Sequence, residues 1–229
     1  MRHALAGLAL CALGGLAGCG NDPALQGNLP TLRALGGVLG PALGGGGAPP
    51  PAAATPEAVA RVLDRLPEGP ALRVALPRTG QSAFAVRAAR NGPHRVFATP
   101  TGQTITLAGG VVTATRGFAG DLMSADTGGL AARLADRAPG RVDRVYRFLD
   151  GTDSEVPLSA ACRLAREGGE TVTLVSGARF ATVRLVESCR ARGRTWRNRY
   201  WVTAAGAVKR SHQWAGPGLG HMRIEAVRD

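Results

Sequence analysis

Residues 178–214, ARFATVRLVESCRARGRTWRNRYWVTAAGAVKRSHQW, decide the fold of this chain. Arginine alternates with valine, leucine or aromatic residues along this stretch, and turn signals at Gly193 and at Ala205-Gly206 divide it into three segments. A period of two indicates strands with one buried and one wet face, and such short turns indicate antiparallel hairpins. The stretch therefore predicts three consecutive strands of an antiparallel meander.

The same pattern continues on both sides of this stretch. Helical spacing, in contrast, is found over 55–66, where Thr55 can cap and Pro67 ends the run, and over 129–136. Strands do not alternate with helices in the manner of a parallel sheet. We therefore expect a mainly β domain, a curved antiparallel sheet or half-barrel (meander) with one or two short helices covering it. Strands are expected at 71–76, 83–89, 94–99, 103–107, 111–115, 141–149, 156–166, 170–176, 178–189, 194–204, 207–214 and 220–228, with a turn at Gly168-Gly169.

The N-terminus has the features of a bacterial lipoprotein signal. Arg2 and His3 precede a short apolar run that ends in Leu16-Ala17-Gly18-Cys19, a lipobox, and the run is too short for a membrane span. We expect residues 1–18 to be removed and Cys19 to carry diacylglycerol on its thiol and an acyl chain on its amine. Gly20 follows in place of the aspartate that commonly retains lipoproteins in the inner membrane, which favours the outer membrane with the domain facing the periplasm.

Composition divides the mature chain into a tether and one domain. Residues 19–54 are dominated by Gly, Ala, Pro and Leu and predict a flexible tether, whereas 55–229 suffice for a single domain with its own core. The formal net charge is +12. In an exported protein this charge suits lipopolysaccharide, anionic phospholipid or an acidic glycan, and not nucleic acid. The alternative is compositional drift, because nearly all the cationic residues are arginine.

Two cysteines are left once the leader and the lipidated residue are set aside. Cys162 and Cys189 form an even pair in an oxidising compartment, so a disulfide is expected, with two buried free thiols as the alternative.

The chain lacks a recognisable catalytic or metal-binding pattern. The histidines of the mature chain are His94, His212 and His221, and they do not lie at metal-ligand spacing. Asp150-Gly151 is the dipeptide of a hairpin turn, and adjacent Ser211 and His212 would face opposite sides of a strand. We expect no enzyme activity, cofactor or metal.

Polar and aromatic residues concentrate near the C-terminus, on two strands that should pair as a hairpin. In one hypothesis they fill the inside of the curved sheet and satisfy one another; in the other they form a platform for a glycan or partner protein. Tyr200 and Trp201 should point to opposite faces, so one is expected in the core and the other to be available for contact. The candidate surface comprises Asn198, Tyr200, Trp201, Ser211, Gln213, Trp214 and, from an earlier segment, Arg116.

These residues also carry a family resemblance. The stretch from Asn198 to Val202, followed by Gly206, Val208 and residues 210–217, resembles the C-terminal signature of the YjbF/GfcB lipoproteins. Residues 109–122, 146–150 and 187–189 resemble other segments of that family, over roughly residues 57–229. The resemblance implies an outer-membrane lipoprotein associated with capsule or exopolysaccharide production and export, encoded beside a large outer-membrane β-barrel protein and a periplasmic companion. It implies no enzymatic activity and a curved antiparallel sheet somewhat like the LolA/LolB carriers.

Three functions are therefore considered. The leading hypothesis is a non-enzymatic accessory lipoprotein for polysaccharide secretion. The second is a carrier or binder of a lipid or glycan inside the half-barrel, which predicts a large apolar cavity. The third is a polysaccharide-modifying enzyme, which needs clustered carboxylates, whereas Asp121, Asp126 and Glu187 are dispersed in the sequence.

Overall fold

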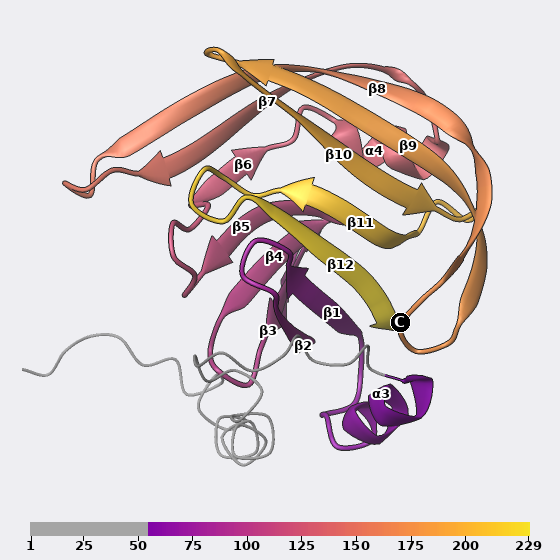
Figure 1. The fold of residues 1–229 in the computed structure, drawn as a ribbon. Coiled ribbons are helices and arrows are strands. Elements are labelled where there is room, and N and C mark those ends of the chain that lie inside the picture. The colour runs from indigo at the N-terminus through magenta and orange to yellow at the C-terminus, as the bar shows by residue number, and fades with distance from the viewer. Residues whose placement is uncertain (1–54) are drawn as a thin grey trace, which may run out of the picture.

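The computed structural model describes residues 55–229, which form one sheet of twelve antiparallel strands with two short helices (Figure 1). The signal peptide, Cys19 and the tether expected over residues 1–54 lie outside the described residues. The elements are α3 (Pro56–Leu63), β1 (Ala71–Leu76), β2 (Gln81–Asn91), β3 (His94–Ala98), β4 (Thr104–Ala108), β5 (Val111–Arg116), β6 (Ser124–Asp126), α4 (Leu130–Asp136), β7 (Gly140–Leu149), β8 (Glu155–Thr173), β9 (Arg179–Ala191), β10 (Arg194–Val202), β11 (Val208–Trp214) and β12 (His221–Arg228).

The sheet is a meander that one long-range pairing closes into a barrel-like shape. Its order is β5-β4-β3-β2-β1-β12-β11-β10-β9-β8-β7-β6, so β1 pairs with the last strand of the chain, with Leu72 opposite Ala226. The outer strands β5 and β6 approach one another, and the amide of Thr115 donates to the carbonyl of Leu122 at 2.9 Å. The predicted curved antiparallel sheet is thus confirmed, and it is nearly closed.

One predicted turn is wrong. Residues 155–173 form the single 19-residue strand β8, without a turn at Gly168-Gly169. A β-bulge takes up the extra residue, because Arg166 lies opposite Leu185 and Gly168 opposite Arg184. Gly168 has a φ of 138°, which favours glycine, so the glycine pair bends the strand and does not end it. The short strand β6 was also not expected from the sequence.

The two helices cover different sides of the sheet. Leu130 and Leu134 of α4 are fully buried in the main core, as expected for a helix over the open side. Helix α3 begins at its predicted cap, since the amide of Ala58 donates to the Thr55 hydroxyl at 3.3 Å. It packs with Val86, whose neighbour Ala85 faces the main core, so α3 lies on the outer face of β2. None of the helices within residues 55–229 combines the length and hydropathy needed to cross a membrane.

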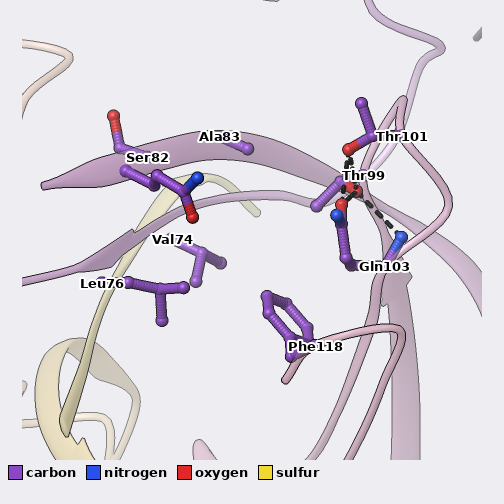
Figure 2. A pocket seen from close by; sticks show the side chains of 9 residues that line it. Val74, Leu76, Ser82, Ala83, Thr99, Thr101, Gln103 and Phe118 are labelled. Atoms are coloured by element: carbon purple, nitrogen blue, oxygen red, sulfur yellow. Dashed lines mark hydrogen bonds between the residues drawn. The ribbon is translucent and has the colours of Figure 1, made fainter. Parts of the chain in front are cut away.

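One end of the barrel has a small pocket of about 280 Å³ (Figure 2). It opens between the β1–β2 hairpin, the β3–β4 turn and the segment after β5. The Phe118 ring lies on one side, and the hydroxyls of Thr99 and Thr101 meet the Gln103 side chain on the other. Its size is slightly below the usual range for small-molecule sites.

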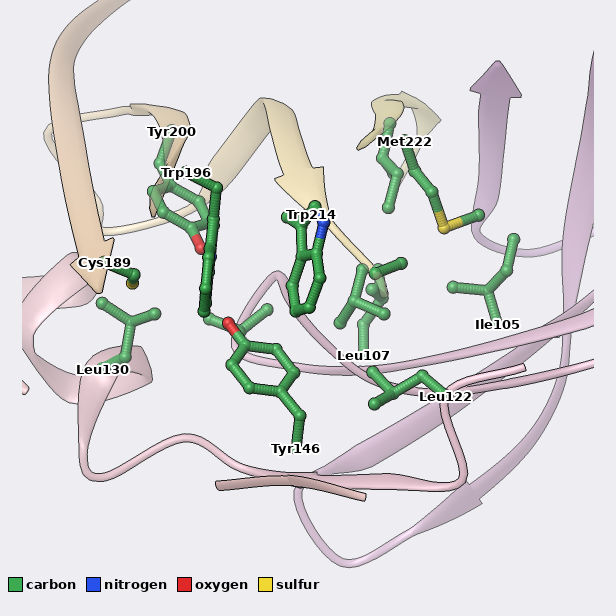
Figure 3. Close-up of a cluster of buried hydrophobic side chains, with 14 of the residues drawn as sticks. Ile105, Leu107, Leu122, Leu130, Tyr146, Cys189, Trp196, Tyr200, Trp214 and Met222 are labelled. Atoms are coloured by element: carbon green, nitrogen blue, oxygen red, sulfur yellow. The ribbon is translucent and has the colours of Figure 1, made fainter. Parts of the chain in front are cut away.

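The middle of the barrel is filled with aromatic side chains (Figure 3). Trp196 and Trp214 stack with ring centroids 4.3 Å apart, and the Tyr146 ring packs edge-on against both. Phe148 contacts Trp214 at 6.0 Å. Two of the three tryptophans, together with Tyr146 and Phe148, therefore form the centre of the core.

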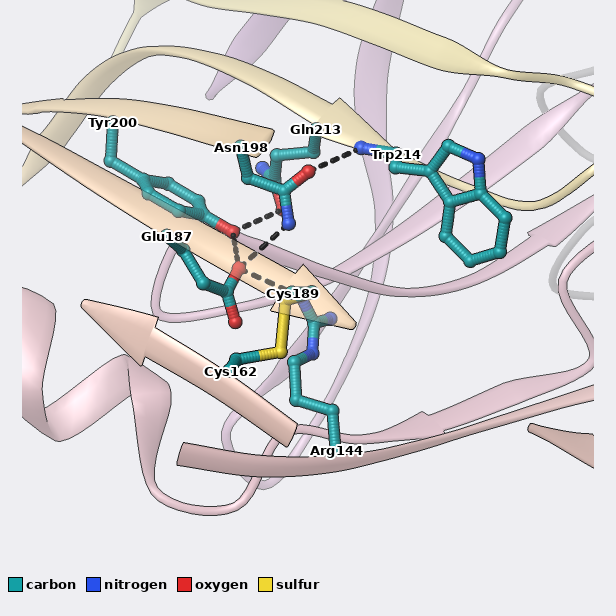
Figure 4. Close-up of a disulfide and its surroundings, with 8 residues drawn as sticks. All are labelled: Arg144, Cys162, Glu187, Cys189, Asn198, Tyr200, Gln213 and Trp214. Atoms are coloured by element: carbon teal, nitrogen blue, oxygen red, sulfur yellow. Dashed lines mark hydrogen bonds and ion pairs between the residues drawn. A yellow bond between two sulfur atoms is a disulfide. The ribbon is translucent and has the colours of Figure 1, made fainter. Parts of the chain in front are cut away.

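The expected disulfide is present. Cys162 and Cys189 are cross-strand partners on β8 and β9, and their sulfurs are bonded at 2.03 Å (Figure 4). Both side chains point into the core, beside the polar residues described below. The bond fixes the register of the longest hairpin in the sheet.

Replacing both cysteines with alanine is expected to lower the free energy of unfolding by about 3–4 kcal/mol, because the unfolded chain regains the loop that the bond closes. Urea denaturation of Cys162→Ala/Cys189→Ala and of the oxidised wild type measures the difference. Reduced wild type serves as the control and should unfold with the double variant. Equal stability of the oxidised wild type and the variant would contradict the prediction.

Candidate functional site

Most of the candidate surface residues face the barrel interior. Asn198, Tyr200, Ser211, Gln213 and Trp214 are all buried. They lie at inward positions of β10 and β11, where the curled sheet shields them, so these five do not form an exposed platform. Their contacts agree with the other hypothesis, in which they satisfy one another inside the sheet.

A buried carboxylate organises this interior (Figure 4). Glu187 on β9 is fully buried, and Arg144 on β7 donates to its Oε2 at 3.2 Å. The same oxygen accepts from the Asn198 amide at 2.7 Å and from the Tyr200 hydroxyl at 3.1 Å, both on β10. A buried charge is stable in a fold only when it is paired and hydrogen-bonded, and Glu187 meets both conditions through Oε2, whereas its Oε1 has no hydrogen-bond partner among residues 55–229.

Gln213 extends this network to the opposite side of the barrel. Its Oε1 accepts from the Val112 amide at 2.9 Å, and its Nε2 donates to the Gly110 carbonyl at 2.8 Å. Tyr200 reaches the same Oε1 at 3.5 Å. The side-chain network therefore connects β7, β9, β10 and β11 with the β4–β5 turn, although β11 and β5 are not neighbours in the sheet.

The protonation of this network suits a structural role. Burial raises the pKa of Tyr200 well above its ordinary value, and the negative charge of Glu187 raises it further. Burial likewise raises the pKa of Tyr146. Both phenols therefore keep their protons, and Tyr200 stays a hydrogen-bond donor to the carboxylate. A general acid or base has to exchange protons with a bound substrate, whereas these groups are shielded in the core.

The disulfide and Glu187 together resemble a metal site only in their geometry. Ligand atoms of Cys162, Glu187 and Cys189 lie within 4.8 Å of one another. Thiolates bind metal ions, but these two sulfurs are bonded to each other. The three residues are therefore a disulfide, Cys162–Cys189, beside the ion pair of Glu187 with Arg144.

Sequence reasoning missed the pairing of Arg144 with Glu187. Glu187 lies between the inward residues Leu185 and Cys189 on the same side of β9, and Arg144 lies between Val142 and Tyr146 on β7. Each charge thus occupies a position that alternation assigns to the core. Two charges of opposite sign at inward positions are the signal that could have identified the pair.

Arg116 helps to close the seam of the barrel, which is the place where the two edge strands β5 and β6 approach one another. Its guanidinium donates to the carbonyls of Leu122 and Met123, both at 3.1 Å, and so joins β5 to the segment that leads into β6. Asp121 holds the intervening turn by accepting from the Thr115 hydroxyl and the Gly117 amide, both at 2.8 Å. The structure thus gives Arg116 a role within the fold, at a position exposed to solvent.

Trp201 lines an outer groove, which the buried Ser211 of the candidate set also borders. Trp201 points away from the core, opposite to Tyr200 as expected, and its indole nitrogen donates to Glu170 at 2.8 Å. The groove, of about 380 Å³, runs over β10, β11, β12 and β1. Glu225 in this groove binds Arg210 at 2.7 Å. The lining residues are Arg73, Arg199, Trp201, Arg210, Ser211, His212, Arg223 and Glu225.

Two histidines at this groove are held neutral. The rings of His212 and His221 lie 4.6 Å apart. Burial, reinforced by the positive charges of His221, Arg223 and Arg199, lowers the pKa of His212 to about 4. Burial also lowers the pKa of His221. The folded protein thus binds protons on this pair more weakly than the unfolded chain.

Replacing Arg144 with methionine is expected to destabilise the domain by about 3–5 kcal/mol, because Glu187 keeps its buried charge without its cation. Urea denaturation measures the change. Arg163→Met, at an exposed position of the neighbouring strand β8, is the matched control and should change stability by less than about 1 kcal/mol. A similar loss in both variants would contradict a special role for the ion pair.

The stability of the wild type is expected to fall as the pH drops from about 6.5 towards 4. The pKa of the His212 side chain is lower in the folded than in the unfolded state. Neutral His212 therefore contributes to the free energy of unfolding above its unfolded-state pKa, and this contribution is lost as the pH falls towards its folded-state pKa. Thermal melting of His212→Gln across this range should show a smaller fall than the wild type. An identical pH dependence of the two proteins would refute the prediction.

Comparisons with known proteins agree with this architecture. A crystal structure of the hypothetical lipoprotein YmcC from Escherichia coli (K12) superposes with a TM-score of 0.64 at 18% sequence identity. The match covers 74% of this chain and 88% of that chain, and at this identity it shows a shared fold. No curated protein sequence matches this chain.

The family comparison covers nearly all of the described domain. Residues 46–227 match the model of the family described as "Group 4 capsule polysaccharide lipoprotein gfcB, YjbF". This range includes the buried network, the disulfide hairpin and the seam. The chain therefore belongs to the YjbF family.

Proposed function

We propose that this protein is a non-enzymatic accessory lipoprotein in the production or export of a capsule or exopolysaccharide. The observation that carries the proposal is the family match over residues 46–227, because that family is described by its capsule polysaccharide lipoproteins. Aromatic side chains fill the middle of the barrel. In this proposal, contacts with polysaccharide or partner proteins therefore take place on the outside of the barrel.

The filled middle of the barrel argues against a carrier that would hold a lipid or glycan at the centre of the barrel. A carrier of the LolA/LolB kind would need a cavity that takes up much of its ligand. Here Trp196, Trp214 and Tyr146 occupy the middle of the barrel. One pocket, of about 280 Å³, lies beside Phe118, and another, of about 550 Å³, lies between α4 and the β4–β5 and β10–β11 turns. None of these three rings lines either pocket, so neither pocket occupies the middle of the barrel.

The carboxylates considered for an enzyme are engaged in the fold. Asp121 holds the turn after β5, and Asp126 accepts from the Gly128 amide at 2.9 Å. Glu187 is buried beside Arg144. Glycoside hydrolysis uses two carboxyl groups facing one substrate, and these three are committed to separate structural contacts. This supports a non-enzymatic function.

Anchoring belongs to the same proposal. Cys19 would carry the lipid, Gly20 after it favours the outer membrane, and residues 19–54 would place the domain in the periplasm. There it would act beside an outer-membrane β-barrel protein and a periplasmic companion.

Deleting the gene is expected to reduce surface polysaccharide, and the Cys19→Ala chain should fail to restore it because the domain loses its anchor. Surface polysaccharide is measured by total-carbohydrate assay of the polysaccharide released from washed cells, and lipidation by labelling with an alkyne analogue of palmitate. The matched control is Cys11→Ala in the leader, which should be labelled and should complement the deletion as the wild type does.

Two outcomes would overturn parts of this proposal. Unchanged surface polysaccharide in the deletion strain under inducing conditions would remove the accessory function. Normal labelling of Cys19→Ala would move the lipid to another residue while leaving the function open to the same complementation test.

A further inference from the structure

The outer face of β7–β10 carries a row of arginines that crosses four strands. Arg141 on β7 lies directly opposite Arg163 on β8, which lies opposite Ser188 on β9, which in turn lies opposite Arg197 on β10. All four side chains are exposed. We call these four residues the arginine row. Neighbouring strands are about 4.8 Å apart, so the row runs in a line across the sheet.

The arginines of this row have no carboxylate partners in the part of the chain that the structure describes. Within residues 55–229, Arg141, Arg163 and Arg197 form no ion pair and no side-chain hydrogen bond. Elsewhere on the outer face some cations are neutralised, as where Arg184 binds Glu167 at 2.9 Å and Glu170 at 3.1 Å, whereas others, such as Arg87 and Arg95, form no ion pair among residues 55–229. Like charges directly opposite on paired strands destabilise a sheet, so the pairing of Arg141 with Arg163 carries a cost that a bound anion would relieve.

The residues beside the row fit a hydrated polymer. The next register line is Asp143, Ala161, Arg190 and Thr195, which adds another arginine and a hydroxyl. Both lines border one open depression of about 1020 Å³. Its outward-facing side chains are cationic, hydroxyl-bearing or small, with Asp143 as the acidic member. A membrane-binding face would set large apolar side chains beside its cations, and the large ring here, Trp196, is turned into the core.

We propose that the arginine row binds the negative groups of an acidic polysaccharide whose chain lies across strands β7–β10. Arginine forks hold carboxylates or phosphates in bidentate pairs, and the hydroxyls of Ser188 and Thr195 suit neighbouring sugar hydroxyls. A chain crossing the strands meets a cation on each of three of them and a hydroxyl on the fourth. This inference rests on the proposed function and names the kind of polysaccharide that the domain handles.

The test uses the full chain in detergent and fluorescently labelled alginate, a linear polymer of uronic acids. Arg163→Gln/Arg197→Gln, on either side of Ser188, is expected to bind alginate about tenfold more weakly by fluorescence anisotropy. Arg87→Gln/Arg95→Gln on β2 and β3 removes the same charge at exposed positions and should weaken binding by less than about twofold. Melting temperatures of both variants verify folding.

Competition identifies the occupant. Unlabelled alginate should displace the probe, whereas neutral dextran and phosphatidylglycerol bicelles should not. Equal weakening in the two double variants, or the absence of binding by the wild type, would overturn the row as a specific site. Displacement by the bicelles as effective as that by alginate would overturn the polysaccharide as its occupant and indicate an anionic lipid surface.

This inference and the proposed function can fail separately. If deleting the gene leaves surface polysaccharide unchanged, the accessory function fails whatever the alginate assay shows. If the deletion lowers surface polysaccharide and Arg163→Gln/Arg197→Gln binds alginate like the wild type, only the arginine row is refuted.

Discussion

The Glu187 carboxylate is the contact on which the rest of this barrel depends. It accepts from Arg144, Asn198 and Tyr200 inside a core otherwise built of aromatic and aliphatic side chains. Through Tyr200 and Gln213 the same network reaches the β4–β5 turn on the other side of the barrel. Hydrophobic packing alone tolerates many arrangements of a curled sheet, whereas the three hydrogen bonds to Glu187 Oε2 form in one of them. We infer that the ion pair specifies the closed form of the sheet.

Register connects this interior to the outer face. Cys162 and Cys189 are paired across β8 and β9, and the next pair along the hairpin is Arg163 with Ser188. A slip of the register by one residue would turn the outward-facing arginine side chains into the core. The disulfide that holds the register of β8 and β9 therefore also keeps the arginine row on the outer face. The β-bulge near Gly168 lies farther along the same hairpin and bends it without disturbing this alignment. The register of the β8–β9 hairpin therefore determines both which side chains enter the core and which form the arginine row.

The sequence pattern predicted most strands and both helices, which follow from local spacing, and the disulfide, which follows from the count of cysteines and the oxidising compartment. It also separated Tyr200 from Trp201 correctly, since adjacent strand residues face opposite sides. It did not predict that β1 pairs with β12, because that contact joins distant segments and depends on closure of the whole sheet. The polarity of Asn198 makes it a candidate surface residue in one of the two hypotheses, although it shares its inward face with Tyr200. Where a core contains a charged residue, the alternation of inward and outward positions along a strand predicts which side chains are buried better than their polarity does.

The arginine content has two explanations, and the structure separates them by position. A compositional bias towards arginine places cations wherever the surface tolerates them, some with acidic neighbours, as Arg184 and Arg210, and some without, as the opposed pair Arg90 and Arg95. Arg141 and Arg163 also lie opposite one another, on β7 and β8, with no carboxylate in ion-pair distance among residues 55–229, and they differ in being aligned with a third strand. Drift gives no reason for the alignment of these arginines with Arg197 in one line over a shallow depression. A ligand that carries negative charge at intervals along its length would account for it, and because the interior is filled, the outer face is where such a ligand can bind.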